Sequence, residues 1–125
     1  MQQPFLVIGA VFGALGVGIG AFGAHALKSV LAASGRSATY ETAVHYHLIH
    51  AVVLLIVGVW ALQAGPALPW LTRAGWSFAA GTVIFSGSLY VLCLTGAKWL
   101  GAITPIGGLL LIAGWLCLAA AALRA

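Results

Sequence analysis

The sequence predicts an all-α integral membrane protein: a four-helix transmembrane bundle with antiparallel, up-down topology, in which residues 1–125 form a single domain. Hydrophobic residues make up 63% of the chain and charged residues 5%, whereas average soluble proteins hold roughly 45–50% and roughly 25%. Five basic residues and one acidic residue cannot cover a soluble globule. The apolar residues also form continuous runs, which favours helices over the alternating strands of a membrane β-barrel.

The first helix is expected at about residues 5–26. The run from Phe5 to Ala24 contains no charged residue, and about 20 apolar residues are enough to cross a bilayer. Its glycines recur at helical spacing and share one face: Gly9, Gly13, Gly16, Gly20 and Gly23. Such a face lets another backbone approach closely. We expect it to pack inside the bundle or, alternatively, to join two copies in a homo-oligomer.

One long connection separates the first two helices. It is a loop of about 15 residues from Leu27 to Glu41, and its polar residues predict a surface loop with a short interfacial helix. The second helix is expected at about residues 42–63, because Gly65, Pro66 and Pro69 follow it and break the helical pattern.

The third and fourth helices are expected at about residues 72–96 and 100–123, in the uncharged runs that Arg73, Lys98 and Arg124 delimit. Four spans place both termini on the same side of the membrane. Tryptophans tend to lie at membrane–water interfaces. We therefore expect an interfacial belt on the side of the termini, formed by Trp60, Trp70, Trp76 and Trp115.

Polar residues are expected in one half of the bilayer. The alternating helix directions bring together the end of the first helix, the start of the second, the end of the third and the start of the fourth. These ends carry His25, Glu41, His45, His47, His50, Ser86, Ser88, Tyr90 and Thr104. At about 1.5 Å per residue, His50 lies roughly 12 Å inside its boundary, Tyr90 roughly 10 Å and Ser86 roughly 15 Å. These three side chains can therefore meet at one level, and His25, Glu41 and His45 would form an outer layer.

The role of His50 stays open at this point. Ionisable residues within membrane spans usually mark function or tight helix contacts. His50 could be a hydrogen bonder between helices, a group that handles a ligand or protons, or a metal or haem ligand. A cavity large enough for a haem is disfavoured in a bundle that glycines pack tightly.

The sequence lacks the residues that several kinds of catalytic or binding site require. A single acid, Glu41, rules out enzymes that use paired carboxylates, and the zinc-protease pattern H-E-x-x-H is absent. The basic residues are scattered singly, so no nucleic-acid partner is expected. Cys93 and Cys117 lie inside apolar runs without metal or redox spacing. Enzymatic activity is not favoured, and we assign no catalytic residue, no metal site and no cofactor.

Four ordered motifs run through nearly the whole chain: GAFGAHAL at 20–27, YETAVHYHLIHA at 40–51, FSGSLY at 85–90 and ITPIGG at 103–108, followed by GW at 114–115. Together they resemble domain-of-unknown-function family 423, the YgdD-type and transmembrane protein 256-like small membrane proteins. The resemblance implies a four-helix membrane protein and brings no established activity, substrate or catalytic residue. In this family, positions that match His45 and His47 are more often arginine and glutamine, whereas His25 and His50 match the motifs.

The resemblance leaves a set of candidate ligand-binding residues: His25, His50, Ser86, Tyr90 and Thr104. The leading hypothesis is a non-enzymatic protein whose one-sided polar pocket binds a small ligand or lipid headgroup, or relays protons. One alternative is a structural accessory subunit or assembly factor of a membrane complex. Another is a redox protein that binds haem or metal. The expected partners are membrane lipids, and the expected location is the inner membrane of a bacterial cell.

Overall fold

The computed structural model describes residues 3–125 and confirms the predicted fold class. Every regular element in that range is a helix, and four segments are long and apolar enough to cross a membrane. The elements are α1 (Pro4–Ala24), α2 (Lys28–Ser34), α3 (Ser37–Ala61), the 3-10 helix η1 (Gly65–Ala67), α4 (Leu68–Thr95), the 3-10 helix η2 (Lys98–Ala102) and α5 (Thr104–Ala122).

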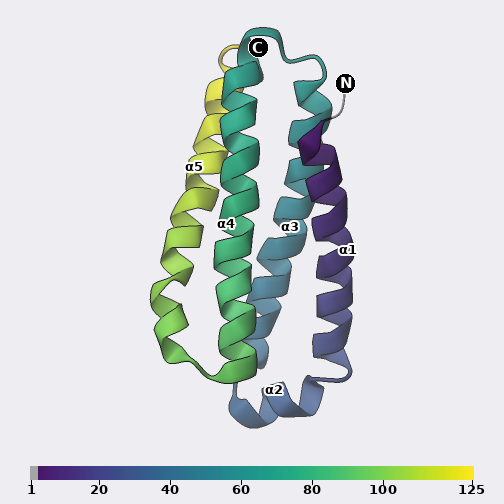
Figure 1. Ribbon diagram of the computed structural model, residues 1–125, viewed down its shortest axis with the longest axis vertical. Coiled ribbons are helices and arrows are strands. Elements are labelled where there is room, and N and C mark those ends of the chain that lie inside the picture. The colour runs from purple at the N-terminus through teal and green to yellow at the C-terminus, as the bar shows by residue number, and fades with distance from the viewer. Residues whose placement is uncertain (1–2) are drawn as a thin grey trace.

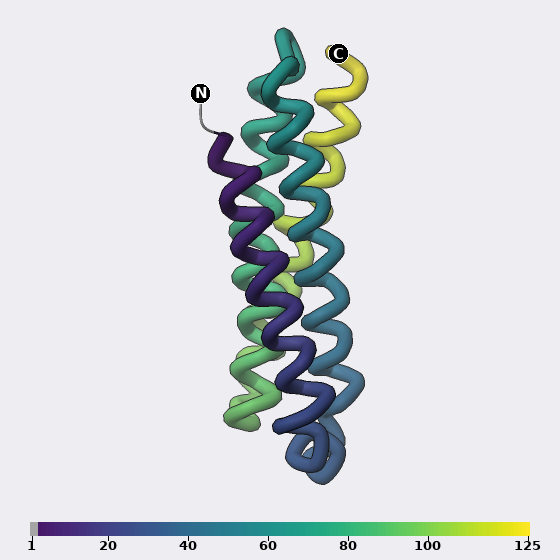
Figure 2. The backbone as a smooth tube through the Cα atoms, turned by 90° about the vertical axis from the view of Figure 1, so that its right-hand side faces the viewer, coloured from purple at the N-terminus to yellow at the C-terminus, as the bar shows by residue number. Residues whose placement is uncertain are grey.

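The four long helices run alternately up and down (Figure 1). The start of α1 and the end of α5 lie at one end of the bundle, which we call the terminal end (Figures 1 and 2). The short helix α2 lies across the opposite end, the α2 end. Helix α1 packs mainly on α3, α3 on α4, and α4 on α5. Helices α1 and α4 meet near the terminal end, where the rings of Phe5 and Trp76 lie 5.3 Å apart.

Helix α3 begins at Ser37 rather than near residue 42, and a left-handed glycine explains this early start. Gly35 has a φ of 71° and turns the chain out of α2, a conformation that glycine adopts without strain. The N–H of Tyr40 then bonds to the Arg36 carbonyl at 3.0 Å. The polar residues expected in a loop therefore form the first turns of α3, close to the α2 end.

Two prolines begin helices rather than end them. Pro69 lies in the first turn of α4 and Pro105 in the first turn of α5. Proline fits there because the first N–H groups of a helix have no partner within the helix. Helix α4 therefore starts at Leu68, earlier than expected. Helix α5 starts at Thr104, later than expected, because the 3-10 helix η2 occupies Lys98–Ala102.

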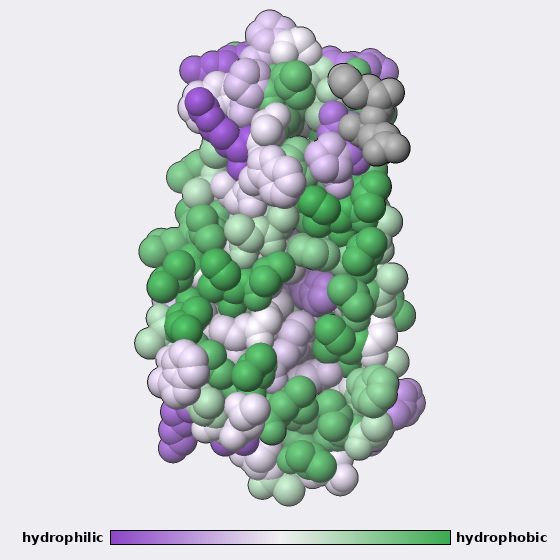
Figure 3. Space-filling view, in the orientation of Figure 1, coloured by the Kyte–Doolittle hydropathy of each residue, from purple (hydrophilic) through white to green (hydrophobic). Residues whose placement is uncertain are grey.

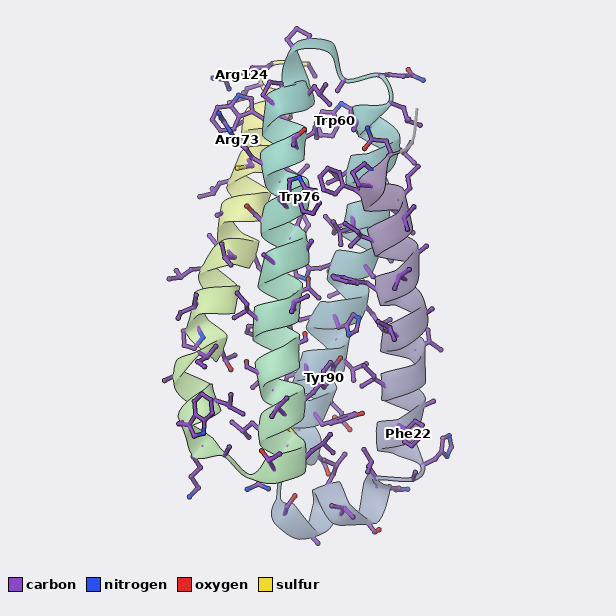
Figure 4. All side chains as sticks on the ribbon, viewed as in Figure 1. Phe22, Trp60, Arg73, Trp76, Tyr90 and Arg124 are labelled. Carbon is purple, nitrogen blue, oxygen red and sulfur yellow. The ribbon has the colours of Figure 1, made fainter. Side chains whose placement is uncertain are left out.

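On the face that Figure 3 shows, hydrophobic residues predominate along the length of the bundle, and hydrophilic residues gather most clearly at the terminal end. Arg73 and Arg124 mark the terminal end (Figure 4), and both guanidinium groups lie 4.7 Å from the ring centre of Trp70. Trp60 and Trp76 lie in the same half of the bundle (Figure 4), where Trp76 is exposed and Trp60 packs partly against the apolar core. Trp115 departs from the predicted belt because its indole turns to α3, as described below.

Glycines let α1 and α3 pack closely. A Cβ atom at Gly9 would lie 2.9 Å from the carbonyl oxygen of Ala51, and one at Gly16 would lie 2.6 Å from the Leu48 side chain. At Gly23 an added Cβ would overlap the ring of Tyr40. This is the small-residue packing that the spacing predicted. Gly13 differs, because an added Cβ there would meet nothing within 4 Å.

The homo-oligomer hypothesis concerns the same glycine face. Helix α3 of the same chain already covers Gly9, Gly16, Gly20 and Gly23. Contact between copies through this face therefore stays a prediction. Of the α1 glycines, only Gly13 and Gly18 leave open space where a second chain could approach.

Glycines also let α4 and α5 pack closely. A Cβ atom at Gly107 would overlap the backbone nitrogen of Phe85, whereas one at Gly108 would meet only the Phe85 ring, at 3.8 Å. We therefore expect Gly107→Ala to lower the free energy of unfolding by about 1–3 kcal/mol, the usual cost of overpacking. Thermal unfolding in detergent measures the effect.

Gly108→Ala is the matched control, because it adds the same methyl group one residue away. It should be neutral or stabilising by up to about 1 kcal/mol, since alanine suits a helix better than glycine. Equal unfolding temperatures for the two variants would contradict this account of the α4–α5 contact.

Candidate functional site

Buried polar side chains lie between the middle of the bundle and the α2 end. They are His47, His50, Thr82, Ser86 and Ser88. Tyr90 lies in this half, whereas Trp60 and Arg73 mark the other (Figure 4). The terminal half holds the main apolar core, in which Leu54, Val57 and Leu71 are fully buried.

His47 and Tyr90 form a hydrogen-bonded pair between α3 and α4. The Tyr90 hydroxyl lies 2.8 Å from His47 Nδ1. Within residues 3–125 this nitrogen is the only hydrogen-bond partner of that hydroxyl. We assign the Tyr90 O–H as the donor and Nδ1 as the acceptor, which leaves the proton of neutral imidazole on Nε2. The Phe12 ring of α1 packs edge-on against the imidazole, with centroids 5.9 Å apart.

Ser86 fixes α4 against α3 next to this pair. Its hydroxyl donates to the backbone carbonyl of Ala43 at 2.7 Å, and the side chain is buried. A serine within a helix often bonds a carbonyl of its own helix instead. The bond across the interface therefore sets how α4 sits on α3, and with it the position of Tyr90.

A crevice of about 190 Å³ lies between α1 and α4, with α3 behind it. Its lining residues are Phe12, Leu15, His47, Thr82, Val83, Ser86, Gly87 and Tyr90. Figure 3 shows a small hydrophilic area on the mostly hydrophobic face, between the atoms of α4 and α1. A longer apolar groove of about 440 Å³ shares Leu15 and Tyr90 with the crevice and extends along α1 to Phe22 and Leu27.

Two side chains that line the crevice each carry a buried polar atom with no hydrogen-bond partner among residues 3–125: Nε2 of His47 and Oγ1 of Thr82. The side chains are only 6% and 4% exposed. The Phe12 carbonyl lies near His47, but its geometry does not make a hydrogen bond. Leaving a buried polar group unpaired costs about 1–3 kcal/mol. Two such side chains along one crevice are therefore the strongest indication of a binding site.

Thr82 differs from four other threonines of the helices. Thr42, Thr72, Thr95 and Thr104 each donate a hydrogen bond to the carbonyl four residues earlier in the chain. This local bond is the usual way in which a hydroxyl is satisfied inside a helix. Thr82 is more deeply buried in α4 but makes no such bond.

His50 faces a different neighbour from His47. Its Nδ1 lies 2.7 Å from the Tyr46 carbonyl, which can only accept, so Nδ1 carries the proton. The indole N–H of Trp115 then donates to Nε2 at 3.2 Å. Both ring nitrogens are engaged, so neither is free to bind a ligand or iron in this arrangement. His50 links α3 to α5.

The five residues expected to form one pocket lie in four places. Ser86 and Tyr90 line the crevice, and His50 bonds to Trp115 instead. Thr104 pairs with Ser88 through hydroxyl groups 2.6 Å apart. His25 is exposed at the end of α1. Sequence reasoning missed His47 and Thr82, because His47 was set aside on the resemblance and no pattern in the sequence singled out Thr82.

Within residues 3–125, no three histidine, cysteine, aspartate or glutamate side chains gather where they could hold a metal ion. The crevice itself offers one imidazole and three hydroxyl groups. This donor set suits hydrogen bonding to an uncharged group rather than coordination of a cation, which anionic oxygens or several imidazoles would favour.

Comparison with known proteins assigns the chain to a family. Residues 19–108 match the family described as "Protein of unknown function (DUF423)". The chain belongs to this family. A UPF0382 membrane protein of Staphylococcus haemolyticus is 47% identical over 117 residues, which cover 94% of this chain and 93% of that protein. The UPF0382 membrane protein YwdK of Bacillus subtilis is 41% identical over 123 residues, which cover 98% of each chain.

These comparisons confirm the resemblance that the four motifs indicated and the assignment as an integral membrane protein. No solved structure matches the chain. The DUF423 description and the names of these relatives state a membrane protein and no activity. Any function must therefore be argued from the geometry of the crevice.

The His50–Trp115 contact generates a testable prediction. Trp115→Phe removes the only donor to His50 Nε2 in the part of the chain that the structure describes. It should lower the free energy of unfolding by about 1–3 kcal/mol, because a buried acceptor loses its partner. It should also shift the ¹⁵N NMR signal of that nitrogen, which reports hydrogen bonding directly.

Trp99→Phe serves as the control, because Trp99 is 67% exposed and also loses an indole N–H. It should change neither the unfolding temperature nor the His50 signal. An unchanged Nε2 signal in Trp115→Phe would show that the proposed hydrogen bond does not exist.

Proposed function

We propose that this DUF423 protein binds a lipid-soluble, uncharged molecule with a carbonyl or hydroxyl group, which enters the crevice between α1 and α4 from the bilayer. One observation carries the proposal: two side chains that line the crevice, His47 and Thr82, each carry a buried atom, Nε2 and Oγ1, that has no hydrogen-bond partner within residues 3–125. A small shift of these side chains would turn both atoms toward a ligand. A carbonyl oxygen accepts hydrogen bonds from N–H and O–H groups and would supply the missing partner.

The position of the crevice supports an uncharged ligand. Thr82 lies near the middle of α4, and His47 lies well inside α3. A charge at that depth in a bilayer is expensive. The Glu41 carboxylate and the basic side chains do not line the crevice, so nothing there would balance a charged ligand.

The adjoining groove supports an apolar tail. It is lined by apolar residues of α1 and α4, with Tyr40 of α3 as part of its floor. Its volume of about 440 Å³ lies within the usual range for ligand pockets, roughly 300–1,000 Å³. A ligand with its polar group at His47 and Thr82 would lay its apolar part along this groove, toward the α2 end.

Methyl nonyl ketone and undecane test the proposal, because they have equal chain length and only the ketone has an acceptor. A ligand that binds the native state raises the unfolding temperature. We expect the ketone to stabilise the purified protein in detergent more than undecane does. Thr82→Val should remove this difference, since loss of one hydrogen bond weakens binding by roughly tenfold.

Thr72→Val is the matched control, because Thr72 lies on the same helix, is exposed and satisfies its hydroxyl locally. It should keep the response to the ketone. Thr82→Val should fold as well as the unmodified protein, since its hydroxyl has no protein partner to lose. An equal response to ketone and alkane in the unmodified protein would overturn the proposal and leave the crevice as a packing gap.

A further inference from the structure

A second cavity, of about 520 Å³, lies at the α2 end between α1, α2 and α3. It is separate from the crevice. It contains the only acidic side chain of the chain, Glu41, together with Lys28 and His45. Within residues 3–125, Lys28 and Glu41 form no ion pair with each other. Two opposite charges therefore face one cavity with neither neutralised by the other.

The walls of the cavity are apolar on the side of the bilayer. Leu31, Val44 and Leu48 line it, and small residues of α1, Gly20, Gly23 and Ala24, form the remaining wall. The cavity lies beside α2, where the chain crosses the end of the bundle (Figure 1). Charged groups therefore sit next to an apolar surface at the expected depth of lipid headgroups.

We propose that this cavity binds a phospholipid whose headgroup carries both a phosphate and a primary ammonium group, as in phosphatidylethanolamine. The phosphate pairs with the Lys28 ammonium, and the headgroup ammonium donates hydrogen bonds to the Glu41 carboxylate. The acyl chains pass along Val44 and Leu48 into the bilayer. No bond is made or broken, so the site is a lipid-binding site.

Charge complementarity selects this headgroup over the common alternatives. An anionic headgroup such as phosphatidylglycerol satisfies Lys28 but brings no cation to Glu41. A choline headgroup brings a cation but no N–H donors, so it cannot hydrogen-bond to the carboxylate. The apolar walls favour an intact lipid over a water-soluble phosphate ester, because only the lipid covers Leu31 and Val44.

Native mass spectrometry of the full chain in detergent tests the proposal with three added lipids: dioleoyl phosphatidylethanolamine, phosphatidylcholine and phosphatidylglycerol, at equal concentrations. We expect the ethanolamine lipid to bind several-fold more than the others. Lys28→Gln should weaken all three, by roughly fivefold. Glu41→Gln should remove the preference for ethanolamine over glycerol and leave binding of the glycerol lipid unchanged or stronger.

Lys98→Gln is the matched control, since Lys98 lies at the same end of the bundle but does not line the cavity. It should leave the lipid preference intact. Three outcomes would overturn the proposal: equal binding of the three lipids, an effect of Lys28→Gln no larger than that of Lys98→Gln, or a preference that survives in Glu41→Gln.

Soluble glycerophosphoethanolamine separates the lipid from its headgroup. It should not displace the ethanolamine lipid at equal concentration, because it lacks acyl chains. Displacement would overturn the assignment to a lipid. Lys28 and Glu41 are both exposed, so their substitution should leave the unfolding temperature unchanged, and the variants report on binding rather than folding.

Discussion

A polar group buried in a bilayer must find its partner inside the protein, because lipid offers none. Within residues 3–125, four such bonds run between α3 and the other long helices, and one of them is the Tyr90–His47 bond of 2.8 Å between α4 and α3. Tyr40 donates to the Ile19 carbonyl of α1 at 2.6 Å, and Ser86 of α4 donates to the Ala43 carbonyl at 2.7 Å. Trp115 of α5 donates to His50 at 3.2 Å. Helix α3 thus holds a polar link to every other spanning helix, and apolar packing between lipid-like surfaces alone would not set these orientations.

Much of the fold follows from the sequence for simple physical reasons. Span length, the scarcity of charge and the alternation of helix direction predict four antiparallel helices without reference to packing. Helix ends were harder to predict, because a proline can lie either in the first turn of a helix or just after its end. Pro69 and Pro105 each lie in a first turn, whereas Pro66 and Pro69 were interpreted as breaks. Gly35, with a φ of 71°, ends α2 in a local turn in which the N–H groups of Gly35 and Arg36 bond to the carbonyls of Ala32 and Leu31. Span length and hydropathy do not locate a turn of this kind.

The candidate site was less predictable than the fold. Depth arithmetic placed the polar residues in the correct half, but depth does not say which helix stands beside which. His47 and His50 lie less than one turn apart on α3, yet His47 faces Tyr90 of α4 and His50 faces Trp115 of α5. That difference depends on the order of helices around the bundle. Thr82 gave no signal at all, because only the structure shows that it lacks a partner.

Tyr40 belongs to both proposed binding regions. Its ring lines the interfacial cavity on one side and the apolar groove on the other, and its hydroxyl is tied to α1. The Tyr40 side chain therefore stands between two neighbouring regions. A displacement of this ring would enlarge one region at the expense of the other. By thermodynamic linkage, a ligand that moved the ring from one side would change the affinity on the other side, and the effect would be equal in both directions.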